Sequence, residues 1–154
     1  MERTLVVLKP DAVQRKLVGD IITRIERKGL KIAAMKMLRV EADLARRMYA
    51  PHEEKNFYAP LLEFITAGPV VAMVLEGVGA IAVVRKMLGK TFGPEAEPGT
   101  IRGDFGMSKR YNIIHASDSP DAAGREIPLF FADAEILEYP TAEWTYATAQ
   151  GKLL

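Results

Sequence analysis

His115 is the residue of this chain whose neighbours best suit it to chemistry. The β-branched run that precedes it predicts a strand, and the stretch from Ser117 to Pro120 that follows predicts the start of a helix. A helix start offers unpaired backbone N–H groups and a partial positive charge, and both favour anions such as phosphate. The sequence therefore places an imidazole at a strand-to-helix junction suited to an anionic substrate.

A carboxylate is expected to reach this imidazole. Glu126 comes seven residues after Ser119, on the same helix face as Ala122 and Ala123, whose small side chains allow close packing. A carboxylate on one ring nitrogen fixes the tautomer and leaves the other nitrogen free as a nucleophile. The local residues alone leave a second interpretation open, a structural histidine at the end of a strand.

The run Asn-x-x-His-Ala-Ser-Asp-Ser at residues 112–119 resembles the active-site signature of the nucleoside diphosphate kinases, whose histidine carries a phosphoryl group between nucleotides. The family usually has glycine in place of Ala116, a difference of one methyl group. The resemblance covers residues 2–138. It implies a ferredoxin-like α+β sandwich with helices covering a four-stranded antiparallel sheet, and a homo-oligomer that is a hexamer or a tetramer.

The resemblance also implies how the transfer occurs. A nucleoside triphosphate gives its terminal phosphoryl group to His115, and a nucleoside diphosphate then takes it, which is a ping-pong mechanism. Glu126 orients the ring with support from Ser117, Lys9 stabilises the transferring charge, and Tyr49 helps to wall the pocket. Lys9 belongs to a Lys-Pro-Asp run that closes the apolar segment 5–8, as the first strand ends in this family.

Nucleotide binding follows from the same resemblance. Phe57 and Leu61 grip the base in a shallow cleft, and a base held by stacking is held with little regard to its identity. The sugar lies near Lys9 and Asn112. The groups that contact the phosphates are Arg85, Thr91 and Arg102. Mg²⁺ is expected to accompany the nucleotide and to be held mainly by phosphate oxygens, because the sequence shows no carboxylate cage for it.

Length and composition limit the classes of protein to which this chain could belong. The chain has 154 residues, enough for one domain, and its 21 Lys and Arg nearly balance its 20 Asp and Glu. No partner nucleic acid is expected, since no basic surface is indicated. The absence of cysteine excludes a disulfide scaffold, and no apolar run is long enough to span a membrane. A cytoplasmic protein is expected.

The remaining segments predict alternating strands and helices. Apolar residues recur with helical spacing over Val18 to Lys28 and again over 57–65, and Asp43 is expected to cap a helix between them. Residues 30–40 predict a half-exposed strand, and Pro69 to Glu76 a central one. Residues 89–111 predict a long loop with a substrate-binding purpose. His52, in a polar stretch, is interpreted as solvated.

A competing motif lies between the predicted central strand and the next helix. Gly77 to Ala82 fits Gly-x-Gly-x-x-Ala, the dinucleotide-binding fingerprint, which makes a dinucleotide-binding protein the alternative function. Against it, Gly89 ends the helix early and no second strand follows directly. Gly89-Lys90-Thr91 resembles the end of a P-loop, but Val84 stands where its first glycine is required.

The chain is expected to divide into a kinase-like domain over 1–138 and a C-terminal tail over 139–154. The tail is polar but carries Tyr139, Trp144 and Tyr146. Aromatic side chains in a polar tail predict docking on a surface, either on this domain or on a neighbouring subunit.

Overall fold

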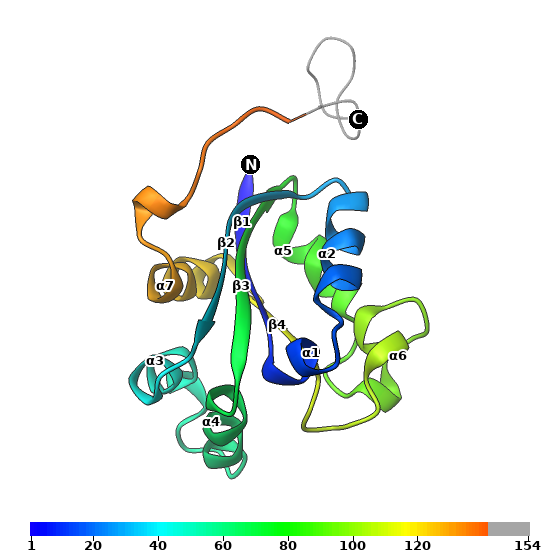
Figure 1. The fold of residues 1–154 in the computed structure, drawn as a ribbon, viewed down its shortest axis with the longest axis vertical. Helices are drawn as coiled ribbons and strands as arrows, with labels where there is room; N and C mark the ends of the chain where they lie inside the picture. The colour runs from blue at the N-terminus through cyan, green and yellow to red at the C-terminus, as the bar shows by residue number, and fades with distance from the viewer. Residues whose placement is uncertain (142–154) are drawn as a thin grey trace.

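The computed structural model describes residues 1–141, which form one four-stranded sheet with helices on both faces (Figure 1). The strands are β1 (Glu2–Leu8), β2 (Lys31–Arg39), β3 (Pro69–Gly77) and β4 (Ile114–Ala116). Their order across the sheet is β2-β3-β1-β4, and every neighbouring pair is antiparallel. This is the predicted ferredoxin-like α+β sandwich, and β3 is one of its two central strands, as predicted.

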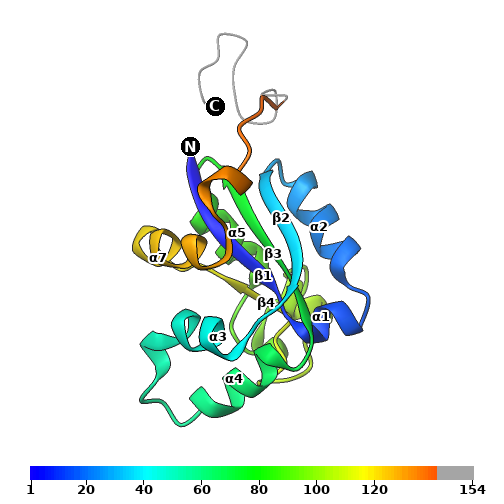
Figure 2. The same cartoon turned by 60° about the vertical axis from the view of Figure 1, so that its left-hand side comes forward.

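The alternation of side chains along β1 divides the core into two layers. Val6 and Leu8 face a cluster that also includes residues of α1 (Pro10–Gln14), α2 (Val18–Arg27), α5 (Ala80–Leu88) and α6 (Ile101–Phe105). Leu5 and Val7 face a second cluster, which is built with α3 (Ala42–Met48), α4 (Tyr58–Thr66) and α7 (Pro120–Phe130). Figure 2 shows the same division, with α3, α4 and α7 on the side of the sheet away from α2.

Several predicted elements agree closely with the structure, and others need correction. The helix expected from Val18 ends at Arg27, and the half-exposed strand runs over Lys31–Arg39. Asp43 does not cap α3, because Glu41 is the N-cap residue and its side chain makes no capping bond; Asp43 lies in the first turn instead.

The segment 89–111 is not one long loop. It contains a 3-10 turn, η2 (Gly93–Glu95), and the helix α6. Thr100 caps α6 by accepting the backbone N–H of Gly103 at 3.0 Å. The helix has only 5 residues and includes a glycine, so its pattern is too short and too weakly helical to be visible in the sequence.

After α7 and the turn η3 (Asp133–Glu135), the chain runs beside β2. The backbone N–H of Leu137 donates to the carbonyl of Ala33 at 2.8 Å, and the Tyr139 hydroxyl donates to the carbonyl of Ile32 at 2.6 Å. Trp144 and Tyr146, on which the docking prediction also rests, lie outside the described residues. Within residues 1–141, no helix combines the length and apolar character needed to cross a membrane.

Candidate active site

His115 is the middle residue of β4, where it pairs with Val7 of β1. It therefore lies within the strand, whereas the sequence placed it at the strand's end. Ser119 caps α7 as predicted, by accepting the N–H of Ala122 at 3.1 Å. The short connection from β4 to α7 brings the buried face of that helix, with Glu126 on it, against the imidazole.

The contacts of Glu126 define the protonation of the ring. Glu126 Oε2 lies 3.0 Å from His115 Nε2 and accepts the Ser117 hydroxyl at 2.6 Å. Because an ionised carboxylate can only accept, Nε2 must carry the hydrogen in this arrangement. The lone pair of a neutral ring is then on Nδ1, which makes Nδ1 the available nucleophile.

The environment favours this charge state. Burial lowers the pKa of His115 below its usual value and outweighs the attraction of Glu126, so the ring is neutral near pH 7. Burial alone would raise the pKa of Glu126, but the hydrogen bonds from His115 and Ser117 and the nearby Arg125 hold it below its usual value. A neutral imidazole beside an ionised carboxylate is the form that a nucleophilic histidine requires.

A chain of hydrogen bonds beside His115 and Glu126 joins Lys9, Asn112 and the backbone of Thr91. The Lys9 ammonium donates to Asn112 Oδ1 at 2.7 Å, and Asn112 Nδ2 donates to the carbonyl of Thr91 at 3.1 Å. Burial, assisted by the charge of Arg102, lowers the pKa of Lys9 to about 8, while Asp11 opposes that shift. Thr91 itself is exposed, so its hydroxyl is open to a ligand.

Two arginines frame the same region. Arg102 is 3% exposed and donates to three backbone carbonyls, those of Asn112 at 3.1 Å, Gly89 at 3.4 Å and Ile114 at 2.6 Å. A guanidinium has five N–H groups, so two remain for a ligand. Burial and the charge of Arg85 lower the pKa of Arg102 to about 10, which leaves it charged at pH 7. Arg85 donates to the carbonyl of Ala116, next to His115, at 3.4 Å.

Aromatic rings lead away from the imidazole on the α3 and α4 side. Tyr49 meets His115 edge to face with centroids 6.2 Å apart; His52 follows at 6.3 Å from Tyr49, and Phe57 at 5.5 Å from His52. Phe57 is 48% exposed, and Leu61, one helical turn on, is partly buried in the second core cluster. The Tyr49 hydroxyl is buried, has no hydrogen-bond partner in the part of the chain that the structure describes, and has a pKa raised by its burial.

The comparison with known proteins identifies the family. The family model described as "Nucleoside diphosphate kinase" matches residues 2–136. The chain is 57% identical to a nucleoside diphosphate kinase of Archaeoglobus fulgidus over 148 residues, which are 95% of this chain and 98% of that protein. The chain belongs to the nucleoside diphosphate kinase family. It is therefore a phosphotransferase enzyme that acts on nucleotides.

Solved structures of the family have the same fold. A nucleoside diphosphate kinase of Halobacterium salinarum, determined in complex with CDP, is 50% identical with a TM-score of 0.92, covering 94% of this chain and 98% of its own. The Borrelia burgdorferi nucleoside-diphosphate kinase, determined with bound vanadate and ADP as a transition state mimic, is 42% identical with a TM-score of 0.88, and the match covers 93% of this chain and 94% of that one.

The dinucleotide alternative is wrong for this member of the nucleoside diphosphate kinase family. α5 does begin after the glycine turn, and Gly79 has a positive φ of 59°. However, the N–H of Ile81 in the first turn donates to the carboxylate of Glu2 at 2.8 Å, so this helix-terminal donor is already engaged by the protein. The next strand, β4, pairs with β1 and not with β3, so no adjacent parallel β-α-β unit forms.

His52 is the residue of this region that the sequence interpretation undervalued. It is exposed, as expected of a solvated side chain, but its ring lies between those of Tyr49 and Phe57. The sequence does place His52 three residues after Tyr49 and five before Phe57, which was the available signal that it belongs with these aromatic side chains. Its polar neighbours Glu53 and Glu54 favoured the interpretation as a solvated residue instead.

Proposed function

We propose that this enzyme transfers phosphoryl groups in two half-reactions through a phosphohistidine on Nδ1 of His115. The observation that carries the proposal is the contact between His115 Nε2 and Glu126 Oε2, since it leaves Nδ1 unprotonated. Tyr49, whose ring meets that of His115 edge to face, also supports a ligand there, because its buried hydroxyl has no hydrogen-bond partner among residues 1–141.

The nucleotide extends from Phe57 to His115. Its base stacks on Phe57 and packs against Leu61, at the exposed end of the aromatic row. Its sugar contacts Lys9 and Asn112, which are already joined by a 2.7 Å hydrogen bond. The groups that contact its phosphates are the guanidiniums of Arg85 and Arg102 and the hydroxyl of Thr91.

Mg²⁺ bound together with the nucleotide would neutralise part of the phosphate charge. Within residues 1–141, no three His, Cys, Asp or Glu side chains are gathered so that they could hold a metal ion. Phosphate oxygens therefore supply most of its ligands. The carboxylates nearest to the reaction, such as Glu126, are already engaged by protein donors.

In the transfer step, Nδ1 attacks the terminal phosphorus, an N–P bond forms, and the bond to the bridging oxygen of the leaving diphosphate breaks. The ring gains positive charge, which the Glu126 carboxylate stabilises through Nε2–H. Lys9 and Arg102 stabilise the charge on the transferred group and the leaving oxygens. A second nucleoside diphosphate then reverses the same step and leaves as the triphosphate.

Low base specificity follows from the way the base is held. Phe57 and Leu61 offer a ring face and an aliphatic side chain, and neither has a hydrogen-bonding group for a base edge. Every base has a π-face that can stack on Phe57, so purines and pyrimidines are both accepted. The relatives determined with CDP and with ADP are consistent with this expectation.

We also propose that residues 1–138 form the catalytic domain and that the enzyme is a homo-oligomer, either hexamer or tetramer. The support is β2, an edge strand whose Met35 and Met37 are 53% and 61% exposed. Apolar side chains exposed on an edge strand favour association with another chain. The segment from Tyr139 would then dock on this domain or on a neighbouring subunit. Light scattering of the purified protein tests the assembly, and a monomer at all concentrations would contradict it.

The intact mass of the protein tests the mechanism directly. After brief incubation with ATP and Mg²⁺ the enzyme should gain one phosphoryl group, about 80 Da by the mass of HPO₃. Addition of GDP, or of CDP or UDP, should remove that group and yield the corresponding triphosphate. The His115→Ala variant should fold, bind nucleotide and gain no mass. Turnover without a phosphorylated protein, or a fully active His115→Ala variant, would contradict the proposal.

A further inference from the structure

The peptide that precedes His115 has an unusual conformation. Ile113 is fully buried and has φ of +73°, a value that β-branched residues rarely adopt. The N–H of Ile114 donates to the carbonyl of Asn112 at 2.7 Å, so the bond spans three residues with Ile113 in the middle. This is the positive-φ form of the γ-turn, which is rare and strained. It connects Asn112 directly to the strand that carries His115.

Such a conformation persists only where its surroundings hold it. The carbonyl of Ile113 accepts the backbone N–H of Lys9 at 2.8 Å. Arg102 donates to the carbonyls on either side of the turn, those of Asn112 and Ile114. The N–H of Ile113 donates to Asp11 Oδ2 at 3.1 Å. Asp11 is thus the one group in this set to which neither the resemblance nor the proposed function gives a role.

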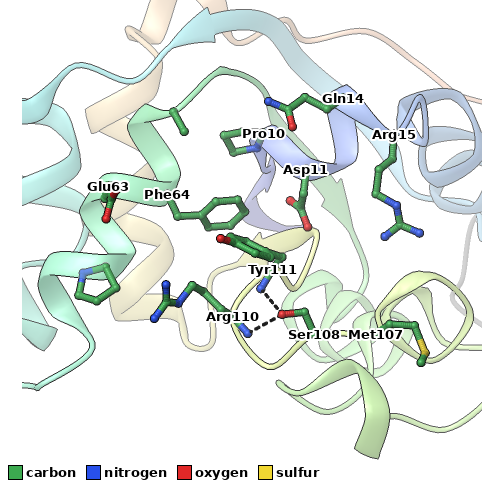
Figure 3. Close-up of a pocket in the computed structure, with 12 residues that line it drawn as sticks. Pro10, Asp11, Gln14, Arg15, Glu63, Phe64, Met107, Ser108, Arg110 and Tyr111 are labelled. Carbon is green, nitrogen blue, oxygen red and sulfur yellow. Dashed lines mark hydrogen bonds between the residues drawn. The ribbon is translucent and has the colours of Figure 1, made fainter.

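The position of Asp11 suits this single task. It lies in the first turn of α1, two residues after Lys9, and lines a cavity of about 480 Å³ between α1, α4 and the segment 107–111. Figure 3 shows its carboxylate directed toward the rings of Phe64 and Tyr111. Its other oxygen, Oδ1, has no hydrogen-bond partner among the described residues. The interaction with Ile113 therefore needs an acceptor at Oδ2 and places no demand on Oδ1.

We propose that Asp11 is a positioning residue that holds the strained Ile113 turn, and thereby sets Asn112 and His115 at the relative positions that phosphoryl transfer requires. The inference rests on the proposed function of those two residues. Without the Asp11 acceptor the N–H of Ile113 would be buried and unpaired, and the turn would relax toward negative φ. The polar atoms of Asn112 and the strand that carries His115 would then shift relative to each other.

The charge of Asp11 gives it a second role, which the experiment must distinguish from its role as an acceptor for Ile113. Its negative charge raises the pKa of Lys9 against the effect of burial. Two variants distinguish the roles: Asp11→Asn keeps an acceptor oxygen for Ile113 and removes the charge, whereas Asp11→Glu keeps the charge and moves the oxygens by one methylene. The amide NH₂ of Asp11→Asn would occupy the place of Oδ1, which accepts no hydrogen bond from the described residues.

The measurement is the rate at which ATP and Mg²⁺ phosphorylate His115 at saturating nucleotide, by rapid quench and intact mass. Asp11→Asn should retain the wild-type rate within about threefold, while Asp11→Glu and Asp11→Ala should be slowed by about tenfold or more, since small misplacements of reacting groups are costly. Gln14→Ala is the matched control, because Gln14 lines the same cavity from the same helix and makes no hydrogen bond to the turn.

Each remaining outcome overturns the inference. A slow Asp11→Asn beside a normal Asp11→Glu would assign Asp11 to the charge balance of Lys9. Equal rates in all variants would show that the turn holds without Asp11. A uniform loss in all three Asp11 variants, tracking a lowered unfolding midpoint, would make Asp11 merely structural. If the wild-type protein itself acquires no phosphoryl group, the proposed function has failed, and that result is distinct from all of these.

Discussion

His115 Nε2 and Glu126 Oε2 lie 3.0 Å apart, and the same Glu126 oxygen accepts the Ser117 hydroxyl at 2.6 Å. One carboxylate oxygen thus fixes the ring and is itself fixed by a hydroxyl on the loop between β4 and α7. Residues 11 positions apart are brought into contact because α7, which follows β4 after a short connection, packs against β1, the neighbour of β4 in the sheet.

The Glu126→Gln variant tests the orientation of the ring. Its amide can donate to Nε2, which favours the tautomer with hydrogen on Nδ1 and blocks the nucleophile. We expect the rate of enzyme phosphorylation to fall on the order of 10²-fold with little change in nucleotide affinity. Single-turnover kinetics and equilibrium binding measure the two effects separately. An unchanged rate would mean that Glu126 does not set the tautomer.

The acid limb of the pH profile reports the state of His115. Because burial lowers the pKa of His115, the neutral ring persists below the usual histidine value of about 6.5. Enzyme phosphorylation should therefore remain above half its maximum at pH 6.5 and decline only as the pH falls further. Glu126→Gln removes a group that raises this pKa, so its acid limb should lie at still lower pH. A midpoint above 6.5 in the wild type would contradict the expectation.

The alkaline limb reports Lys9, whose ammonium has a pKa of about 8. Above that pH the free enzyme loses the charge that stabilises the transferring group, so kcat/KM should decline with a midpoint near pH 8. Bound phosphates favour the charged form, so the decline in kcat should come at higher pH. Lys9→Gln should be slow and lack this limb, whereas Lys86→Gln, on the exposed side of α5, should retain it.

The Phe57→Ala variant tests the base site. Stacking of one base on an aromatic ring contributes about 1–3 kcal/mol, so KM should rise roughly 5- to 150-fold for all nucleotides. The rate at saturation should change little, since Phe57 lies at the far end of the aromatic row from His115. Met107→Ala, a truncation of another exposed apolar side chain, is the control. A loss confined to one base would contradict the proposed indifference to base identity.

The Tyr49→Phe variant separates the hydroxyl from the ring. The hydroxyl is buried and finds no hydrogen-bond partner among the described residues 1–141, so its removal should leave the free energy of unfolding within about 1 kcal/mol of wild type or raise it. If that hydroxyl contacts the transferring phosphate, kcat should fall by about tenfold. Chemical denaturation and steady-state kinetics measure the two quantities. A destabilised variant with normal kcat would give Tyr49 a structural role only.

Much of this fold could be predicted from the sequence, because several segments are long enough for the spacing of their apolar residues to identify a helix or a strand. The helix from Val18 and the apolar strand from Pro69 were predicted within one residue or so of their ends. Strand order could not be predicted from the pattern, because hydrophobic periodicity identifies the buried face of a strand and not its neighbours. The family resemblance supplied the ferredoxin-like fold and its antiparallel sheet. The helix α1 was missed because its 5 residues, Pro10–Gln14, give too little periodicity.

The site was predicted unevenly for similar reasons. Glu126 was found from its helix face alone, because i, i+3, i+4 and i+7 spacing is a geometric property of a helix. The roles given to Lys9, Arg102 and Thr91 came from the resemblance, since no local pattern brings segments so far apart in sequence together. The positive φ of Ile113 has no sequence signal, because tertiary contacts impose it on a β-branched residue.

The hydrogen bond from the N–H of Ile81 to Glu2 ties the beginning of the chain to the helix that carries Arg85. Versions of the protein made for expression should therefore keep Glu2 and carry any added sequence before Met1. Trimming or replacing this residue would fray the first turn of α5 and loosen an arginine that lies one helical turn further along. A reduced affinity for phosphates in such a preparation would then originate more than 80 positions away from the arginine in the primary structure.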